Sequence, residues 1–230
     1  MSKAVVLSSG GLDSTTCLAM AVKKYSAANV STLSIFYGQR HAKELEAANN
    51  VANFYNVAHY ELDASEVFRL SDSALLNTST APLDKGSYAA QIKKNNSQRI
   101  ATYVPFRNGL MLSMAASFAD GLYNDSHVDV YIGVHADDSA TFAYADCRAD
   151  FVAAMNAAIR IGTYEKIRLV APFLGQSKAD VVKVGLELNA PYQLTWSCYE
   201  RGDRPCGQCA TCIDRARAFK LNGVKDPALA

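Results

Sequence analysis

The chain has 230 residues, enough for one large core and a small appendage but not for a second catalytic domain. Half of the residues are hydrophobic and the net charge is only +1, so the basic excess typical of nucleic-acid-binding proteins is missing. The apolar run 4–7 is too short for a signal peptide, and no stretch approaches the roughly 18 apolar residues of a membrane span. We therefore expect a cytoplasmic protein that binds neither nucleic acid nor membrane.

The first part of the chain alternates strand-like and helix-like patterns. Residues 4–7 predict a buried strand, 10–11 a tight glycine turn and 14–24 a helix with an apolar face. A second strand is expected at 32–37, followed by a helix at 43–56. This alternation is typical of an α/β fold with a parallel sheet.

The second part continues the alternation after an interruption. Residues 71–100 are rich in Ser, Thr, Asn and Lys, which predicts a long loop, either an active-site cover or a plain surface insertion. Asn108 is expected to cap the next helix, and Ser177 with Asp180 forms a capping-box pattern at the start of a later one. The other expected elements are a strand at 128–134, a polar loop at 135–146, a helix around 151–159 and a strand at 168–173.

A serine- and glycine-rich segment, residues 8–15, follows the first strand. Adjacent glycines let successive backbone N–H groups face phosphate oxygens, and the helix that follows adds the positive end of its dipole. Asp13 would repel phosphate, so it is expected to hold Mg²⁺ or to cap the helix. The segment lacks the Gly-Lys-Ser/Thr ending of a Walker loop and the G-x-G-x-x-G of dinucleotide-binding proteins. An ordinary glycine turn is the alternative.

Four cysteines near the C-terminus have the spacing C-x7-C-x2-C-x2-C. Four thiolates complete a tetrahedral zinc shell with no position left for water, which indicates a structural zinc, one per chain. The alternatives are an iron–sulfur cluster and redox or disulfide thiols. We expect two regions, a nucleotide-binding domain at 1–190 and a zinc-binding region at 191–230. The predicted zinc ligands are Cys198, Cys206, Cys209 and Cys212.

The serine- and glycine-rich segment resembles the PP-loop of the N-type ATP pyrophosphatases, which cleave ATP to AMP and pyrophosphate while adenylating a carbonyl oxygen. Six further segments resemble the 7-cyano-7-deazaguanine synthases within that group. They run in family order, and with the PP-loop the resemblance covers residues 4 to about 219. Ala145 departs from the family pattern, which usually has proline there. The six segments are 104–108, 133–138, 142–147, 162–164, 195–199 and 206–209.

The resemblance implies a Rossmann-like, adenine nucleotide alpha hydrolase-like fold and an enzyme of queuosine precursor biosynthesis. Such an enzyme converts 7-carboxy-7-deazaguanine and ammonium to 7-cyano-7-deazaguanine, using two ATP with Mg²⁺, by adenylating first the carboxylate and then the amide. No glutaminase domain fits in this length, and a homodimer is expected. The implied ATP-binding residues are Ser8, Ser9, Gly10, Gly11, Leu12, Asp13, Ser14, Thr15 and Lys178. The implied substrate residues are Arg107, Asn108, His135, Asp138, Tyr144, Asp146 and Arg148.

Three other functions remain open. A PP-loop tRNA-modifying enzyme could use the cysteines for sulfur transfer or a cluster, although the near-zero net charge disfavours tRNA binding. A scaffold without turnover is the second, and a homologue that only forms the amide is the third, which Ala145 keeps open. Cys147 could have a covalent role, and Gln39 and His41 are weaker candidates for the nucleotide side.

Overall fold

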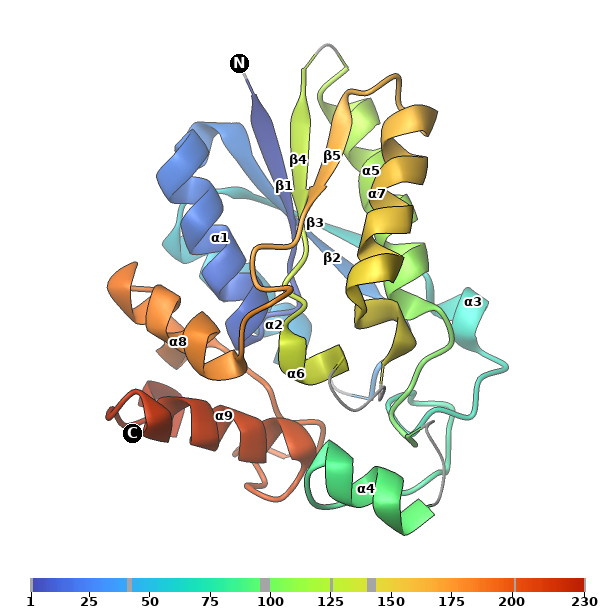
Figure 1. Ribbon diagram of the computed structural model, residues 1–230, viewed down its shortest axis with the longest axis vertical. Coiled ribbons are helices and arrows are strands. Elements are labelled where there is room, and N and C mark those ends of the chain that lie inside the picture. The colour runs from blue at the N-terminus through green and yellow to red at the C-terminus, as the bar shows by residue number, and fades with distance from the viewer. Residues whose placement is uncertain are drawn as a thin grey trace.

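The computed structural model describes residues 2–40, 43–95, 100–124, 126–139, 144–200 and 202–229, without the side chains of Asn95, Asp138 and Ser139. In this part of the chain, five parallel strands form one sheet in the order β3-β2-β1-β4-β5 (Figure 1). The predicted α/β fold with a parallel sheet is therefore confirmed. The strands are β1 (Lys3–Leu7), β2 (Val30–Phe36), β3 (Ala58–Asp63), β4 (Val128–Tyr131) and β5 (Ile167–Val170).

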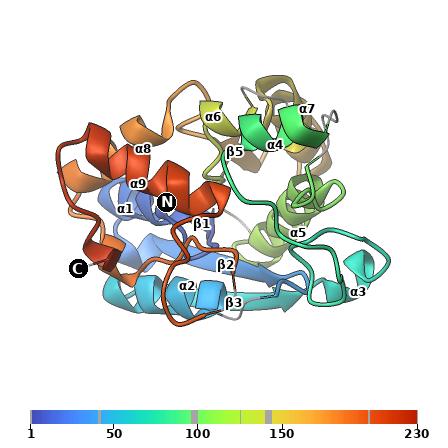
Figure 2. The same cartoon turned by 90° about the horizontal axis from the view of Figure 1, so that it is seen from below.

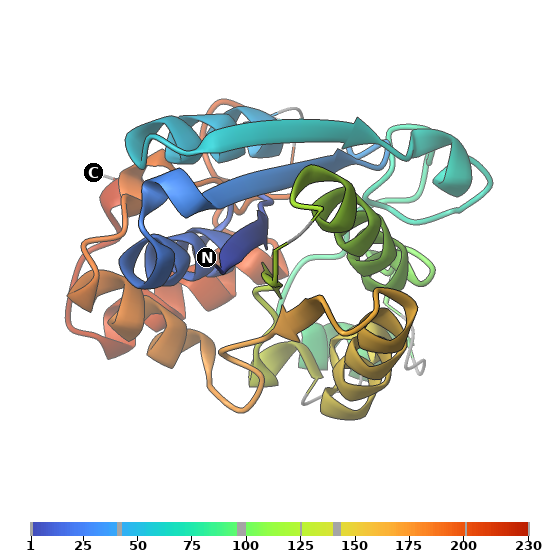
Figure 3. The same ribbon diagram turned by 90° about the horizontal axis from the view of Figure 1, so that it is seen from above.

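Helices cover both faces of the sheet (Figure 3). Alternate side chains of a strand point to opposite faces, so Val5 packs on one side while Ala4 and Val6 pack on the other. Val5 belongs to a core shared with helices α5 (Arg107–Leu122) and α7 (Ala149–Gly162). Ala4 and Val6 belong to a core shared with helices α1 (Leu12–Tyr25), α2 (Lys43–Phe54) and α8 (Lys178–Glu187).

The bounds of three predicted strands differ from the structure. β2 is Val30–Phe36 instead of 32–37, and β5 is Ile167–Val170 instead of 168–173. β4 ends at Tyr131 instead of residue 134, and the residues that follow it line the site described below. β3 was not predicted at all. It is an edge strand that pairs only with β2, and its burial pattern is mostly exposed, so it lacks an apolar run.

The prediction of a long loop over 71–100 was wrong for residues 88–95, which form helix α4 (Tyr88–Asn95). Residues 73–76 of the same segment are buried, so this part packs against the core. Seen from below the sheet, α4 lies beside helix α9 (Ala210–Leu221) (Figure 2). The backbone N–H of Gly86 donates to the Gln208 carbonyl at 3.1 Å, so this segment is joined to the C-terminal region.

The C-terminal residues pack on the sheet domain. Tyr192, Ala218 and Phe219 share a buried cluster with Leu12 of α1 and Val182 of α8. The division at residue 190 stays a prediction. The remaining short elements are η1 (Ala27–Asn29), α3 (Ser65–Phe68), α6 (Ala136–Ser139), η2 (Ala145–Cys147), η3 (Tyr192–Leu194) and η4 (Pro227–Leu229). Within the described residues, no helix has the length and apolar character needed to cross a membrane.

Candidate active site

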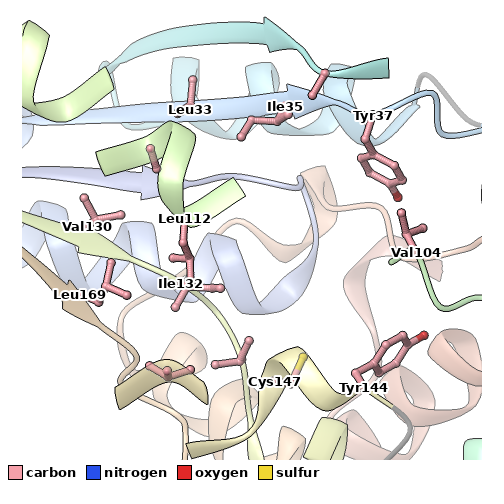
Figure 4. Packing of buried hydrophobic residues seen from close by; sticks show 14 of the residues in the cluster. Leu33, Ile35, Tyr37, Val104, Leu112, Val130, Ile132, Tyr144, Cys147 and Leu169 are labelled. Carbon is pink, nitrogen blue, oxygen red and sulfur yellow. The ribbon is translucent and has the colours of Figure 1, made fainter. Parts of the chain in front are cut away.

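A cavity of about 240 Å³ lies at the carboxyl ends of the central strands. Leu7, Tyr37 and Ile132, at or just beyond the ends of β1, β2 and β4, form part of its wall. The chain runs from β1 outward to β3 and then returns to β4 on the other side of β1, so this edge is a topological switch point, where α/β folds bind ligands. Tyr144 and Cys147, two residues of the wall, are seen in Figure 4 at the end of the apolar core.

The glycine turn between β1 and α1 packs directly on α2. Gly10 has φ of +70°, in the left-handed region that favours glycine. A Cβ at this position would lie 2.3 Å from the Glu44 carbonyl oxygen and 2.7 Å from the Ala48 nitrogen. Gly133, after β4, closely approaches the first turn of α1, since its Cβ would lie 2.9 Å from the Asp13 carbonyl carbon. The backbone around the glycine turn is therefore in close contact with the backbone of α2 on one side and with the segment after β4 on another.

Hydrogen bonds of the Ser14 hydroxyl stabilise the conformation of the glycine turn. The Ser14 hydroxyl accepts from the Ser9 N–H at 3.2 Å and donates to the Gly11 carbonyl at 3.3 Å. Gly11 is the N-cap of α1 and supplies no side-chain capping bond, so the first backbone N–H groups of the helix remain for a ligand. Ser8, Ser9, Gly11, Asp13 and Ser14 all line the cavity.

Asp13, Lys178 and His135 meet beside this turn. Lys178 Nζ lies 2.6 Å from Asp13 Oδ2 and 3.4 Å from His135 Nε2, while His135 Nε2 lies 3.8 Å from Asp13 Oδ1. Burial raises the pKa of Asp13, but the positive charge of Lys178 and the nearby His135 outweigh this, so its pKa lies below the usual value. The carboxylate is therefore ionised at neutral pH.

The first turn of α8 fixes the position of Lys178. The Ser177 hydroxyl accepts from the Asp180 N–H at 3.3 Å, and the Asp180 carboxylate accepts from the Ser177 N–H at 2.9 Å. The capping box expected from the sequence is thus confirmed. Asp137, after β4, also accepts from the Lys178 N–H at 2.9 Å. These bonds attach the helix start to the loop that follows β4.

Tyrosines surround the guanidinium of Arg107, which also lines the cavity. Arg107 Nη1 donates to the Tyr37 hydroxyl at 3.2 Å, and its guanidinium carbon lies 5.1 Å from the centroid of that ring. Burial alone would lower the pKa of Arg107, but Tyr37, Tyr199 and Tyr144 more than offset this and raise it. The Tyr88 ring packs edge-on against Tyr144 with 5.4 Å between centroids. A permanent positive charge thus faces an aromatic-lined space.

The four cysteine sulfurs predicted as metal ligands lie within 4.8 Å of one another. A tetrahedral zinc with Zn–S bonds of about 2.3 Å would need sulfurs about 3.8 Å apart, so this set fits the ion. Cys206 N–H donates to Cys198 Sγ at 3.3 Å, and Cys209 N–H donates to Cys206 Sγ at 3.3 Å. Gly207, with φ of +69°, makes the turn between the ligands. The cluster can therefore hold a metal ion, as predicted.

The cysteine region forms one wall of the cavity. Trp196 N–H donates to the Gly10 carbonyl at 2.9 Å, which joins the segment before Cys198 to the glycine turn. Thr211, in the first turn of α9, donates its hydroxyl to the Ser197 carbonyl at 2.6 Å. The wall residues from this region are Trp196, Ser197, Tyr199, Thr211 and Asp214.

A buried ion pair anchors that wall from behind. Arg215 Nη2 lies 2.8 Å from Asp226 Oδ1, and both side chains are almost fully buried. The same guanidinium donates to the Thr195 hydroxyl at 2.8 Å and to the Ser197 hydroxyl at 3.2 Å. The position of the wall therefore depends on this pair.

The model of the family described as queuosine biosynthesis protein QueC matches residues 3–223. The chain belongs to this family. The resemblance seen in the sequence is thus confirmed. The 7-cyano-7-deazaguanine synthase of Archaeoglobus fulgidus is 40% identical over 228 residues, covering 99% of this chain and 90% of that protein. The protein of the same name from Pseudoalteromonas atlantica is 41% identical over 225 residues, covering 98% and 97%.

A solved structure shares the fold. The U34-tRNA thiolase NcsA of Methanococcus maripaludis, determined with its [4Fe-4S] cluster, superimposes with a TM-score of 0.50 and 14% sequence identity. The match covers 88% of this chain and 62% of the thiolase. At this identity, the comparison supports the α/β architecture alone.

The predicted ATP residues differ in their exposure to the cavity. Lys178 lines it together with the five loop residues named above. Leu12 is buried in the core beside Tyr192 and does not contact the cavity, and Gly10 is covered by α2. The Thr15 hydroxyl is buried and has no hydrogen-bond partner among the described residues.

The predicted substrate residues fall into several places. Arg107, Asn108, His135 and Tyr144 line the cavity. Asn108 was wrongly predicted as a helix cap, since α5 begins at Arg107 after a left-handed Phe106. The cap comes from another segment, because the Asp146 carboxylate accepts from the Asn108 N–H at 2.9 Å.

Of the other predicted substrate residues, Arg148 lies away from the cavity, and the side chain of Asp138 is not among the described parts of the structure. Arg148 bonds to Asp150 at the exposed start of α7, with Nη2 to Oδ2 at 2.7 Å, and does not line the cavity. The side chain of Asp138 and the whole of His41 lie outside the described residues. Gln39 does line the cavity, and its side-chain oxygen accepts from the Tyr37 N–H at 2.8 Å. The roles predicted for these residues stay predictions.

Sequence reasoning missed several wall residues. Tyr37 was only the end of a predicted strand, and Tyr88 lay inside the predicted loop. Glu44, in the first turn of α2, was placed in an amphipathic helix and received no role, yet it lines the cavity. Its position directly after the polar segment that follows β2 was the available signal, since loops after parallel strands converge on the same edge.

Proposed function

We propose that the protein is an ATP-dependent carbon–nitrogen ligase that converts 7-carboxy-7-deazaguanine and ammonia to 7-cyano-7-deazaguanine, releasing AMP and pyrophosphate. Family membership supports the reaction class. The observation that carries the proposal is the shared cavity, whose lining includes both the glycine turn with Asp13 and Lys178 and Arg107 with its tyrosines. One space can therefore hold a nucleotide and an anionic, planar substrate together.

The glycine turn would bind the phosphates of ATP. Backbone N–H groups at the start of α1 and the Lys178 ammonium supply positive charge where pyrophosphate leaves. Asp13 fits a Mg²⁺ ligand, because its buried Oδ1 accepts no hydrogen bond from the described residues. Magnesium would supply charge neutralisation on the phosphates. The Lys178 ammonium would therefore pair with Asp13 before ATP binds and with a phosphate oxygen of ATP afterwards.

Arg107 and Tyr144 would hold the deazaguanine. A guanidinium pairs with a carboxylate through two hydrogen bonds, and an aromatic ring stacks on a flat base. Asn108 and His135 supply further polar contacts, while Asp146 acts through Asn108 by fixing the start of α5. Asp138 and Arg148 complete the substrate set that the family resemblance implies.

The proposed chemistry uses the same loop twice. A carboxylate oxygen attacks the α-phosphorus of ATP, pyrophosphate leaves, and ammonia then displaces AMP from the acyl carbon to give the amide. A second ATP adenylates the amide oxygen, and loss of AMP with the nitrogen protons leaves the nitrile. The protein contributes positioning, charge neutralisation and exclusion of water from the adenylate.

We propose that the four cysteines hold one structural zinc, which would keep the wall from Trp196 to Tyr199 in place. Protein as purified should contain about one zinc per chain. Cys212→Ser should lose the metal and lower the melting temperature, because formation of the site and local folding are coupled. A Cys212→Ser variant that melts like the parent protein would contradict this assignment.

We also propose that the enzyme is a homodimer, which ultracentrifugation would check.

The direct test incubates the protein with 7-carboxy-7-deazaguanine, ammonium, Mg²⁺ and ATP and identifies the products by mass spectrometry. We expect the nitrile with two AMP per product. Amide alone would indicate the half-reaction enzyme that Ala145 keeps open; its side chain is exposed and does not line the cavity. No AMP would refute the proposal.

A further inference from the structure

One carboxylate of the cavity has no role in the steps described so far. Glu44 lies in the first turn of α2, and part of its surface faces the cavity. Its backbone carbonyl is the group against which the glycine turn packs, so it sits beside the proposed phosphate site. It is also within electrostatic range of Arg107 and Tyr37, which lie on the proposed substrate side. Glu44 therefore lies close to residues of both groups, the glycine turn and Arg107 with Tyr37.

Among the described residues, Arg107 is the charged group whose effect on the Glu44 carboxyl is resolved. Within the described part of the chain, no hydrogen bond or ion pair joins a donor to the Glu44 carboxylate. Burial raises the pKa of Glu44 to about 7, and the positive charge of Arg107 offsets only part of this. A carboxyl group with such a pKa can accept a proton near neutral pH and return it to solvent.

The nitrogen donor needs a group of this kind. Ammonium is a cation at neutral pH, and it must lose a proton before its nitrogen can attack an acyl carbon. Arg107 attracts the carboxylate of the substrate, whereas Glu44 repels it and attracts a cation. The two opposite charges in one cavity would thus direct the two reactants to adjacent positions, with the acyl carbon between Arg107 and the glycine turn.

We propose that Glu44 binds the ammonium ion and accepts its proton in the amide-forming step. This inference rests on the proposed function. Ammonium transfers one proton to the Glu44 carboxylate, and the nitrogen lone pair forms the C–N bond. The bond from the acyl carbon to the AMP oxygen breaks, and AMP leaves with that electron pair. The adduct nitrogen releases a second proton to water, and Glu44 later returns its own.

The test separates adenylation from amide formation. Exchange of labelled pyrophosphate into ATP, with 7-carboxy-7-deazaguanine but without ammonium, reports adenylation alone. Glu44→Gln should keep this exchange and the KM for ATP, while its KM for ammonium rises at least about tenfold, as expected for loss of a charge-assisted hydrogen bond. Glu46→Gln is the matched control, since Glu46 lies in the same helical turn with an exposed side chain. The control should behave like the parent protein.

A second nucleophile tests the proton-accepting role. Hydroxylamine is uncharged at neutral pH, so it needs neither a cation site nor a base before attack. It should form the hydroxamate with Glu44→Gln at a rate close to that of the parent protein. A merely structural role of Glu44 would impair both nucleophiles equally.

Several outcomes would overturn the inference. An unchanged KM for ammonium in Glu44→Gln would do so, and so would loss of the exchange reaction in a folded variant, since Glu44 would then serve ATP. If Glu44→Gln does not fold, Glu44→Asp keeps the charge but withdraws it by one methylene; an ammonium KM equal to that of the parent would refute the role. No exchange in the parent protein would instead refute the proposed function itself.

Discussion

Replacing Gly10 with alanine should destabilise the protein by about 2–5 kcal/mol. The residue has φ of +70°, and an L-residue with a Cβ pays about 1–2 kcal/mol to adopt the left-handed region. The added carbon would lie 2.3 Å from the Glu44 carbonyl oxygen and 2.7 Å from the Ala48 nitrogen. Both neighbours are backbone atoms of α2, so the helix or the turn must shift, at a further cost of about 1–3 kcal/mol.

Urea unfolding of Gly10→Ala and Gly121→Ala would measure this effect. Gly121 lies near the end of α5, and no atom of the described residues lies within 4 Å of a Cβ placed there. Alanine at this helical position should raise stability by about 0.5–1 kcal/mol. Pyrophosphate exchange should fall in Gly10→Ala because the phosphate-binding turn moves. A Gly10→Ala protein as stable as the parent would show that the close packing of the turn on α2 is mistaken.

Two further predictions concern ionised groups. Asp226→Asn should cost about 3–5 kcal/mol because it leaves the Arg215 charge buried without a counterion. Asp150→Asn, in an exposed pair, should change the stability little, and comparable losses in urea unfolding would contradict the burial argument. Lys178 helps to hold the pKa of Asp13 below 3.8, so ionised Asp13 contributes stability above that pH, and the contribution is lost as the pH falls through its folded pKa. In Lys178→Met, burial should raise this pKa, so the substitution should destabilise more at pH 7 than at pH 3, and equal losses at both would count against the assignment.

Local patterns predicted the parts of the site that are continuous in sequence. The glycine turn follows β1 as expected because an apolar run, two glycines and a helical pattern succeed one another within a few residues. The capping box at Ser177 and the cysteine spacing are equally local, and both match the structure. Each of these features depends on geometry that neighbouring residues determine among themselves.

The missed parts depend on contacts between distant segments. Asp146 caps α5 from 38 residues away, so Asn108 was assigned a role that another residue fills. Tyr88 and Tyr199 hydrogen-bond through their hydroxyls across 111 positions, and nothing near either residue indicates this. β3 was missed for another reason, because an edge strand with exposed side chains shows no apolar run.

The hydrogen bond from Trp196 to Gly10 has a consequence for the order of events during synthesis. The first loop of the chain is synthesised early, but a wall that faces it comes from Trp196, Ser197, Tyr199, Thr211 and Asp214, which are synthesised much later. Contacts of such long sequence separation form late in folding, because the intervening chain must first be ordered. The sheet can assemble before these residues are made, whereas a closed cavity exists only after they have been added. A prematurely terminated chain would keep its phosphate loop and lack the wall that encloses it.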